Sequence, residues 1–435
     1  MFQRKIPLRQ IANKMTTLEN KLHFALSTIG LLIMLFHESS GERQLIFVHV
    51  MWRHGARAPL TLFPSEYDQT IQNWPNGLGE LTPLGILQQF QLGTFLRQRY
   101  EKLIPKYKSD TIYIRSTDSN RTIMSAMANL AGMFPPENSQ NILNLTWQPI
   151  PIHTIPKTLD KVLDVTYSTC PYPDHVFYSE EMNSETVRAI MDEKAPLFDF
   201  LRERTGLEIP TFTDIFDVYD LLNCEKAHNM VETNRTWMNE ALFKEIEDLF
   251  LKSTLHYYSN SKITPFRGGP LLQSVAEVLM KKAKKIYNDQ LKYMAYSAHE
   301  TGIIAFFTSM QIYNTSLIPD FAACIMTELY EEEDGTYTVD ILYKRSLKEE
   351  VQVLELPWCG TVCNFETFIN WSNNIAVKDW EKECGLRREE NFSELQQRRA
   401  VIFLSVALIV AITGLCILSV MYYQLKTLIK LKIPD

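Results

Sequence analysis

The sequence is short of the features that mark fibrous, disordered or nucleic-acid-binding proteins. Glycine accounts for only 16 of 435 residues and no internal repeat is present, which excludes a collagen-like or low-complexity chain. There is no basic surplus either, because 44 lysines and arginines are outnumbered by 51 aspartates and glutamates, giving a net charge of −7. A chain of this charge is not expected to bind nucleic acid. Its length and its 46% hydrophobic content predict a globular protein with a large core.

Two uncharged runs near the ends of the chain predict its placement in a membrane. Residues 24–36 follow five basic residues and precede small ones, so residues 1–41 have the layout of a signal peptide, whether translation begins at Met1 or Met15. Residues 400–423, at about 1.5 Å per residue, reach across a bilayer as one helix. A buried core helix is the alternative for this second run, but basic residues flank it on both sides. Together the runs predict a type I single-pass membrane protein.

Between these two runs, strand and helix patterns alternate. Buried strands are expected at 45–51, 111–114 and 293–296, each followed by a helix. This alternation predicts an α/β fold: a central, mostly parallel sheet flanked by helices on both faces, with ligands bound beyond the carboxyl ends of the strands. The predicted organisation is an α/β core over 42–154 and 266–385, an inserted and mainly helical cap over 155–265, a juxtamembrane linker over 386–399, the membrane helix over 400–423 and a cytoplasmic tail over 424–435.

Polar clusters follow the three predicted strands, where the carboxyl ends of parallel neighbours meet. The first, at 53–57, reads Arg-His-Gly-Ala-Arg and places two guanidinium groups around an imidazole, a spacing that suits a tetrahedral dianion. A neutral imidazole held against phosphorus is a competent nucleophile and passes through a phosphohistidine. The second cluster adds Arg115, and the third places His299 beside Glu300. Each cluster alone also fits a surface basic loop or a packed histidine, but the three together favour an anion site.

The cysteines agree with an extracytoplasmic domain. Six of the seven lie outside the two hydrophobic runs, and an even number in a secreted domain favours three disulfides. Only Cys359 with Cys363 is suggested by proximity; half of a zinc site is the alternative for this pair, but no histidine or cysteine pair follows at zinc spacing. N-glycosylation sequons begin at Asn120, Asn144, Asn234, Asn314, Asn370 and Asn391.

The order of these motifs resembles the histidine acid phosphatase family, and within it the animal lysosomal and prostatic type. The resemblance rests on Arg-His-Gly-x-Arg-x-Pro at 53–59, Arg-Ser-Thr-Asp at 115–118, and Ser-Ala-His followed by an acid at 297–300, and it runs from Gln44 to Cys384. It implies an acid phosphatase that hydrolyses phosphate monoesters without a metal or other cofactor. It also implies a homodimer, located in lysosomes or endosomes or at the cell surface.

Carried over residue by residue, the resemblance implies roles for the three clusters. His54 is the nucleophile, and the phosphoryl oxygens are bound by Arg53, Arg57, Arg115 and His299. A glycan on Asn120, on the helix behind Arg115, would crowd this site, so we expect that sequon to stay unused and the other five to be modified. The implied disulfides join Cys170 with Cys384, Cys224 with Cys324, and Cys359 with Cys363.

One position departs from the family pattern, in which an aspartate follows the second histidine and protonates the leaving oxygen. Here Glu300 takes that place. Glutamate has a similar reference pKa, but its extra methylene moves the carboxyl by about 1 Å, and misplacement of that size costs on the order of a hundredfold in rate. We expect Glu300 to be a working general acid. The alternatives are a catalytically weak ectodomain that binds a phosphorylated ligand, and an inositol polyphosphate phosphatase, for which the cap segment lacks a basic run.

Overall fold

The structure is a computed structural model that describes residues 43–136, 147–166, 170–209, 212–230, 235–286, 290–313, 318–386 and 392–430. The predicted signal peptide lies outside these residues, as do the sequons at Asn144, Asn234, Asn314 and Asn391. The side chains of Asn120 and Asn370 are exposed. Whether each sequon is glycosylated stays a prediction.

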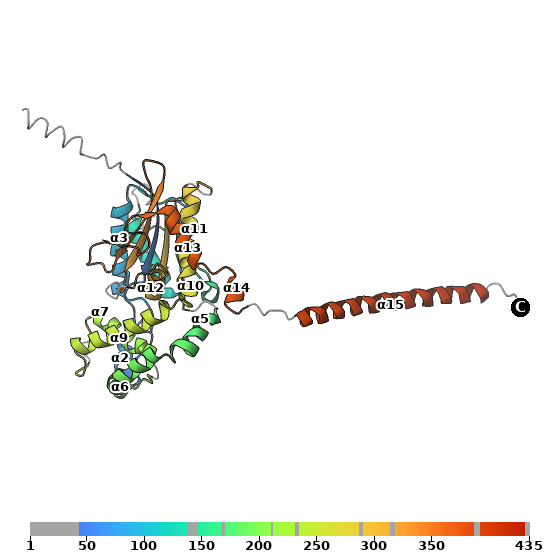
Figure 1. Cartoon of the computed structure of the whole chain (residues 1–435), viewed down its shortest axis with the longest axis horizontal. Coiled ribbons are helices and arrows are strands. Elements are labelled where there is room, and N and C mark those ends of the chain that lie inside the picture. Colours follow the sequence, from blue (N-terminus) through green and yellow to red (C-terminus); the bar gives the residue numbers. More distant parts are fainter. Residues whose placement is uncertain are drawn as a thin grey trace, which may run out of the picture. The chain divides into compact units, whose positions relative to one another are not determined.

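A mixed β-sheet forms the core of the described chain (Figure 1). Its strands are β1 (Gln44–Arg53), β2 (Ile112–Ser116), β3 (Tyr293–Ala298), β4 (Cys324–Glu331), β5 (Tyr337–Lys344), β6 (Gln352–Val353) and β7 (Cys363–Asn364). They lie in the order β2–β3–β1–β4–β5–β6, with β7 beside β5. The parallel part consists of β2, β3 and β1, and β4 and β5 extend it in antiparallel pairing. The three strands that precede the polar clusters are therefore parallel neighbours, as predicted.

Strand β1 explains why the sheet is covered on both faces. Its residues from Phe47 onward are all buried, as expected for a central strand rich in β-branched and aromatic residues. Successive side chains of a strand point to opposite faces. Phe47 and Met51 accordingly join one hydrophobic cluster, whereas Val48 and Trp52 join another.

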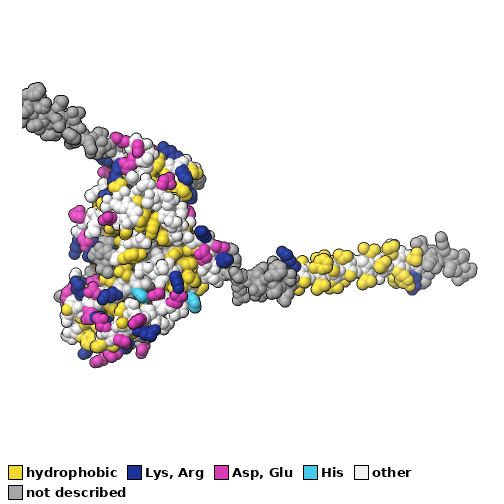
Figure 2. Space-filling view, viewed as in Figure 1, with side chains coloured by type: hydrophobic (Ala, Val, Ile, Leu, Met, Phe, Trp, Pro, Cys, Tyr) yellow, Lys and Arg dark blue, Asp and Glu magenta, His cyan; other side chains and the backbone are white. Residues whose placement is uncertain are grey.

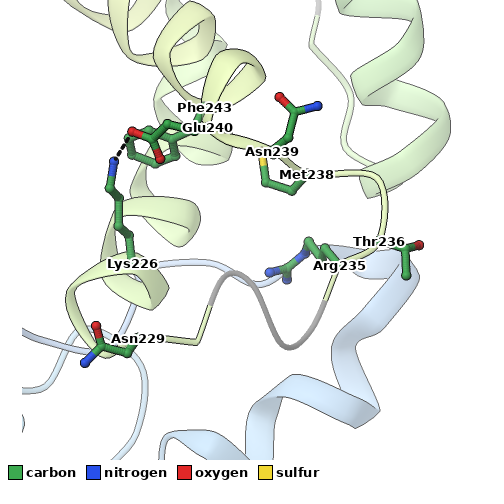
Figure 3. Close-up of a pocket in the computed structure, with 8 residues that line it drawn as sticks. All are labelled: Lys226, Asn229, Arg235, Thr236, Met238, Asn239, Glu240 and Phe243. Atoms are coloured by element: carbon green, nitrogen blue, oxygen red, sulfur yellow. Dashed lines mark hydrogen bonds and ion pairs between the residues drawn. The ribbon is translucent and has the colours of Figure 1, made fainter.

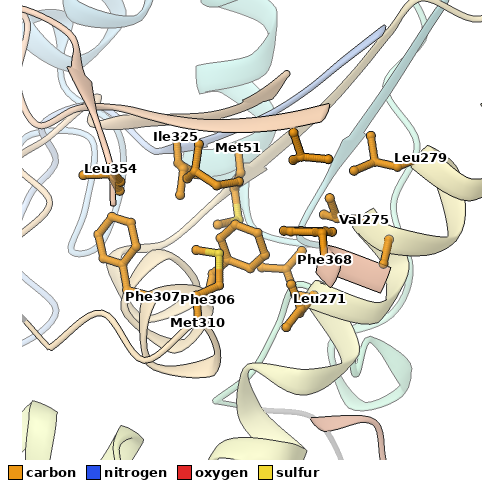
Figure 4. Close-up of a cluster of buried hydrophobic side chains, with 14 of the residues drawn as sticks. Met51, Leu271, Val275, Leu279, Phe306, Phe307, Met310, Ile325, Leu354 and Phe368 are labelled. Carbon is orange, nitrogen blue, oxygen red and sulfur yellow. The ribbon is translucent and has the colours of Figure 1, made fainter. Parts of the chain in front are cut away.

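Two groups of helices complete these clusters. They are α3 (Pro83–Tyr100) and α4 (Asn120–Met133) on one face, and α11 (Gly269–Ala283), α12 (Glu300–Ser309) and α13 (Phe365–Ile375) on the other. Phe306 of α12 and Phe368 of α13 pack in the same cluster as Met51 (Figure 4). Leu92 of α3 and Leu130 of α4 pack with Trp52. The predicted α/β fold, with helices on both faces, is confirmed.

The segment predicted as a cap is helical, and its buried side chains form a hydrophobic cluster that also includes residues that follow β1, such as Phe63 and Trp74. Its elements are α5 (Pro171–Val176), a π-helical turn (Phe177–Glu181), α6 (Glu185–Thr205), α7 (Ile215–Ala227), α9 (Glu240–Tyr258) and α10 (Thr264–Arg267). Helices α6 and α9 begin at capping side chains: Ser184 accepts from the Val187 amide, and Asn239 from the Leu242 amide. The inserted helical cap is thus confirmed, and its boundaries at 155 and 265 stay predictions.

The C-terminal part forms a separate unit, Lys378–Asp435 together with Cys170–Tyr172. It contains α14 (Trp380–Glu383) and α15 (Phe392–Lys430). Within α15, Arg399–Thr427 has a mean hydropathy of 2.9 and is long enough to cross a membrane. The side chains along this span are mostly hydrophobic, and basic residues lie at both of its ends (Figure 2). The predicted membrane helix therefore has a counterpart in the structure.

Two of the three predicted disulfides are present: Cys170 with Cys384 and Cys359 with Cys363. The predicted bond between Cys224 and Cys324 is not formed, and both residues are free, buried thiols. They lie in different hydrophobic clusters, Cys224 within the cap and Cys324 beside the sheet. Cys324 packs there as a small apolar side chain, and Cys224 Sγ also accepts a hydrogen bond from Arg57 Nη1 (3.5 Å).

Candidate active site

His54 follows β1 and is held in one orientation. Its amide donates to the Ala298 carbonyl at the end of β3 (2.9 Å), and its carbonyl accepts from the Ala322 amide (3.1 Å). The imidazole Nδ1 lies 2.8 Å from the Gly55 carbonyl oxygen. Because a carbonyl can only accept, Nδ1 carries the proton and the lone pair is on Nε2. That nitrogen faces the Glu300 carboxylate, 3.8 Å away.

The loop after β1 packs too closely against α3 for a side chain at two positions. A Cβ on Gly55 would lie 2.2 Å from the Gly85 carbonyl oxygen, and a Cβ on Gly85 would lie 2.1 Å from the Ala56 oxygen. Helix α3 also fixes the loop through Gln89, whose amide donates to the Arg53 carbonyl (2.8 Å). The glycine of the first motif is thus explained by the close approach of this loop to a helix.

Arg53 and Glu300 form an ion pair close to His54 Nε2. Arg53 Nε lies 3.0 Å from Glu300 Oε2, and Nη1 donates to the Pro319 carbonyl (2.8 Å). The guanidinium carbon lies 4.2 Å from the centroid of the Phe321 ring. Both charged side chains are buried, where their attraction is stronger than in water. Glu300 is therefore held by the same guanidinium that is predicted to bind phosphate.

Arg57 connects the motif to the cap. Its terminal nitrogens donate to both carboxylate oxygens of Asp220 on α7 (2.6 and 3.1 Å), and Asp220 also accepts from the Leu60 amide (2.8 Å). The sequence analysis did not find Asp220, because 163 residues separate it from Arg57 and the pattern around it is that of an ordinary helix. The ion pair with Asp220 fixes the Arg57 guanidinium group and neutralises its charge on the side of the two terminal nitrogens.

The neighbouring strands bring Arg115 and His299 to the same edge of the sheet. Arg115 lies opposite Tyr296 in the parallel register of β2 and β3 and forms an ion pair with the buried Asp160. The His299 ring centroid lies 5.5 Å from that of His54. All three clusters therefore meet, as their positions at parallel strand ends predict.

Arg121 is a fourth guanidinium at the site, and the sequence analysis missed it. It lies in the first turn of α4, with Nη2 3.4 Å from His299 Nδ1. After burial, its charge is the strongest cause that lowers the pKa of His54 and of His299. The sequence contained a signal for it, because Arg121 lies at the start of the predicted helix that follows Arg115 and is therefore close to the same strand end.

Burial and arginine charges set the protonation of three groups. Burial, followed by the neighbouring arginines, lowers the pKa of His54 well below its ordinary 6.5. The same causes lower the pKa of His299 to about 3. Burial alone would raise the pKa of Glu300, but Arg53 and Arg57 outweigh it and lower that pKa to about 2. At mildly acidic pH, both imidazoles are neutral and Glu300 is a carboxylate.

The buried nitrogens at this edge that make no hydrogen bond within the described chain include His54 Nε2, Arg57 Nε and Arg115 Nε. Buried polar groups are nearly always satisfied in folded proteins. Two donors beside an imidazole lone pair suit a tetrahedral oxyanion with its central atom in front of the imidazole. The described residues contain no group of three or more His, Cys, Asp or Glu side chains placed to hold a metal ion.

A hollow of about 690 Å³ in the cap is separate from this site (Figure 3). Lys226, Arg235 and Phe243 are among its lining residues. Arg235 is buried and forms ion pairs with Glu66 (2.7 Å) and Glu225. Its charge is therefore already neutralised by two carboxylates.

Comparison with known proteins identifies the family. The model of the histidine phosphatase superfamily, branch 2, matches residues 44–344. The chain belongs to this superfamily. Rat lysosomal acid phosphatase is 33% identical over 380 residues, which cover 85% of this chain and 88% of the relative. Human prostatic acid phosphatase is 36% identical over 372 residues, which cover 82% and 93%.

Solved structures agree on the fold. The phytase of Citrobacter braakii is similar with a TM-score of 0.59 at 17% identity, over 78% of this chain and 99% of the phytase chain. At that identity the likeness concerns the fold alone. The family and the relatives confirm the prediction that this histidine phosphatase is an acid phosphatase, a hydrolase of phosphoric monoesters.

Proposed function

We propose that this acid phosphatase acts through a phosphohistidine on His54, with Glu300 as the general acid. The fixed tautomer of His54 carries the proposal, because Nδ1 is tied to the Gly55 carbonyl and Nε2 faces the anion-binding edge. The lowered pKa keeps this imidazole unprotonated in acid, where a free histidine would lose its nucleophilic lone pair. The phosphoryl oxygens are bound by Arg53, Arg57, Arg115, Arg121 and His299.

The proposed reaction has two steps. His54 Nε2 attacks phosphorus, so that an N–P bond forms and the P–O bond to the alcohol breaks, while the leaving oxygen takes a proton from Glu300. A water molecule then gives a proton to the Glu300 carboxylate and attacks the phosphohistidine. The N–P bond breaks, inorganic phosphate leaves, and both side chains return to their starting states. Throughout, the arginines stabilise the charge on the phosphoryl oxygens.

Glu300 has to gain a proton before the first step. Beside Arg53 its pKa is about 2. A bound phosphate ester competes for that guanidinium and adds negative charge close to the carboxylate, and both effects raise the pKa of Glu300. Low pH and bound substrate therefore favour the active form together. This coupling predicts an acid optimum.

The proposed location and partners rest on the candidate span, the relatives and the net charge. The candidate span Arg399–Thr427 and the lysosomal relatives support a membrane-anchored enzyme of lysosomes or endosomes, with its catalytic domain in the lumen. The cell surface is the alternative location. A homodimer is still expected from the family, and nucleic acid is not expected as a partner, given the net charge of −7.

A second candidate is a catalytically weak protein that binds a phosphorylated ligand. The ion pair of Glu300 with Arg53 favours it, since an acid that stays ionised cannot protonate a leaving group. An inositol polyphosphate phosphatase draws support only from the fold shared with phytases.

The decisive experiment measures phosphate release from an aryl phosphate by the detergent-solubilised full chain, over about pH 3 to 8. We expect a maximum in acid that His54→Ala abolishes and that His175→Ala, which changes an exposed histidine of α5, leaves intact. Tight binding of inorganic phosphate without release of phosphate from the ester would instead establish the ligand-binding candidate.

A further inference from the structure

The second motif contains a threonine, Thr117, whose side chain the proposed reaction does not use. Its hydroxyl oxygen lies 3.0 Å from Nε2 of His299 and 2.8 Å from the hydroxyl oxygen of Thr122. The Thr122 hydroxyl in turn lies 2.9 Å from the Ser119 carbonyl oxygen. All three side chains are buried. They form one hydrogen-bonded chain, which begins at the His299 ring and ends at the backbone just before α4.

The direction of this chain is fixed at its backbone end. The Thr122 hydroxyl faces two carbonyl oxygens, those of Ser119 (2.9 Å) and Thr117 (3.1 Å). Carbonyls only accept, so Thr122 donates its single hydrogen to the backbone. The Thr117 hydroxyl then has to donate to Thr122, and only a lone pair of its oxygen is left for His299. Nε2 of His299 therefore carries the proton and donates it to Thr117.

The other ring nitrogen gives the same assignment independently. Nδ1 of His299 lies 3.4 Å from Nη2 of Arg121. A guanidinium group can only donate, so Nδ1 carries the lone pair of a neutral ring. The charged and titratable groups around the ring are Arg121 of α4, Glu300 of α12, and Arg57, Arg53 and His54 from β1 and the loop after it. Burial and the arginines lower the pKa of His299 to about 3, so in mild acid the ring keeps this lone pair.

An acceptor at this position distinguishes the protonation states of a phosphate ester. The second pKa of a phosphate monoester is about 6, so in mild acid the ester is mostly a monoanion with one P–OH group. Guanidinium groups bind its charged oxygens, whereas the P–OH hydrogen needs an acceptor. A fully ionised anion would instead place an oxygen lone pair against the lone pair of Nδ1, and that contact is repulsive.

We propose that Nδ1 of His299 accepts a hydrogen bond from the P–OH group, and that Thr117 is the positioning residue that holds the ring in this tautomer. The enzyme then takes the singly charged ester as its substrate. The P–OH group replaces Arg121 at Nδ1 and leaves that guanidinium to the charged oxygens. The inference rests on the proposed function, because it places the phosphoryl group at the edge where His54 and the arginines meet.

Inorganic phosphate and sulfate test the acceptor directly. The two anions have the same shape, but at about pH 5 phosphate is a monoanion that carries hydrogens, and sulfate is a dianion that carries none. Charge alone favours sulfate at a site rich in arginine. Calorimetric titration of the full-length protein should nevertheless give a Kd for phosphate about tenfold or more below that for sulfate, a difference of about 1.4 kcal/mol.

Thr117→Val keeps the shape of the side chain and removes the hydroxyl that accepts from Nε2. Nδ1 can then carry the proton and donate to sulfate, so the preference for phosphate should fall about tenfold. Thr117→Ser retains the hydroxyl and should retain the preference. Thr205→Val is the control, because it removes a buried hydroxyl at the end of α6 that donates to the Leu201 carbonyl (2.7 Å). It should leave the preference unchanged.

Binding of sulfate as tightly as phosphate by the wild-type protein would overturn the proposal without any variant. An unchanged preference in Thr117→Val, with a thermal transition showing that the variant is folded, would also overturn it. If Thr117→Val did not fold, the wild-type comparison would still decide. The titrations need no turnover, so they stay decisive even if no phosphohistidine forms on His54 and the proposed function fails.

Discussion

Glu300 is at once the counter-ion of Arg53 and the proposed acid, and these two roles require different charge states. Its Oε2 atom lies 3.0 Å from Arg53 Nε and 3.8 Å from His54 Nε2. As a carboxylate it stabilises the guanidinium, and only as a carboxylic acid can it protonate a leaving oxygen. The longer side chain of glutamate therefore still places a carboxyl group beside His54 Nε2.

Glu300→Gln keeps the shape of this side chain and removes its proton. For an alkyl phosphate we expect kcat/KM, which reports the formation of the phosphohistidine, to fall on the order of a hundredfold. For 4-nitrophenyl phosphate, whose leaving oxygen needs no proton, the loss should be much smaller. Steady-state kinetics on both substrates measure the difference, with Glu300→Asp as the variant that retains an acid. An equal loss on both substrates would assign Glu300 a structural role only.

Arg121 is expected to set the acid limb of the pH profile. After burial, its charge is the strongest cause that lowers the pKa of His54 and His299, so Arg121→Ala should raise both pKa values. The imidazoles would then be protonated at higher pH, and the acid limb of kcat/KM would move upward in pH. Arg188→Ala, which alters an exposed arginine that donates to the Asn183 carbonyl, should leave the profile unchanged. An unmoved acid limb in Arg121→Ala would contradict this assignment.

At the scale of elements, the site depends on how closely α3 packs against α4. A Cβ on Gly93 would lie 1.9 Å from the Asn129 carbonyl oxygen, and a Cβ on Gly132 would lie 2.1 Å from the Phe90 oxygen. Helix α3 fixes the chain next to His54, and α4 carries Arg121. The two glycines thus allow α3 and α4, which position opposite sides of the site, to pack in close contact.

Gly93→Ala should therefore destabilise the fold. Forcing a methyl group into this contact costs about 1–3 kcal/mol in the free energy of unfolding. Gly302→Ala in α12 is the matched control, because its Cβ would meet nothing closer than the Leu163 carbonyl oxygen at 3.8 Å and alanine favours a helix interior. Urea unfolding of both variants measures the difference. Equal stabilities would show that α3 and α4 can separate without cost.

The elements and the site were predictable to different degrees. The three motifs follow strands that are parallel neighbours, and parallel strand ends meet at one edge, so His54, Arg115 and His299 could be placed together from the sequence. Asp220 could not, because its contact with Arg57 depends on how the cap folds back over 163 residues. The pairing of Cys224 with Cys324 came from resemblance alone, and the structure places the two thiols in different cores.

Over the whole molecule, buried neutral histidines couple stability to pH. His49, in the middle of β1, has its pKa lowered to about 3 by burial. The pKa values of His54 and His299 are lowered by burial and by the neighbouring arginines. Below about pH 6.5 the unfolded chain binds protons that the folded protein excludes. The stability that these groups contribute is therefore complete above that pH and is lost as the pH falls toward 3.

His49→Phe isolates one of these contributions. The His49 ring packs edge-on against Tyr296, 4.4 Å between centroids, so phenylalanine can take its place. The variant should lose less stability in acid than wild type, by about 1.4 kcal/mol for each pH unit between about 6 and 3. Urea unfolding at a series of pH values measures the slope, and the exposed His175→Phe serves as control. An unchanged slope would show that His49 is not neutral in the folded state.

The central claim is a covalent phosphoryl group on His54, and trapping it is the most direct measurement. Full-length enzyme mixed with an aryl phosphate is quenched in alkali within the first turnover, digested, and analysed by mass spectrometry, because phosphohistidine survives base. The account predicts one phosphorylated peptide, modified at His54, which is missing in His54→Ala and accumulates when Glu300→Gln processes a substrate with a good leaving group. Phosphate release without any such peptide, or a phosphoryl group on another residue, would contradict it.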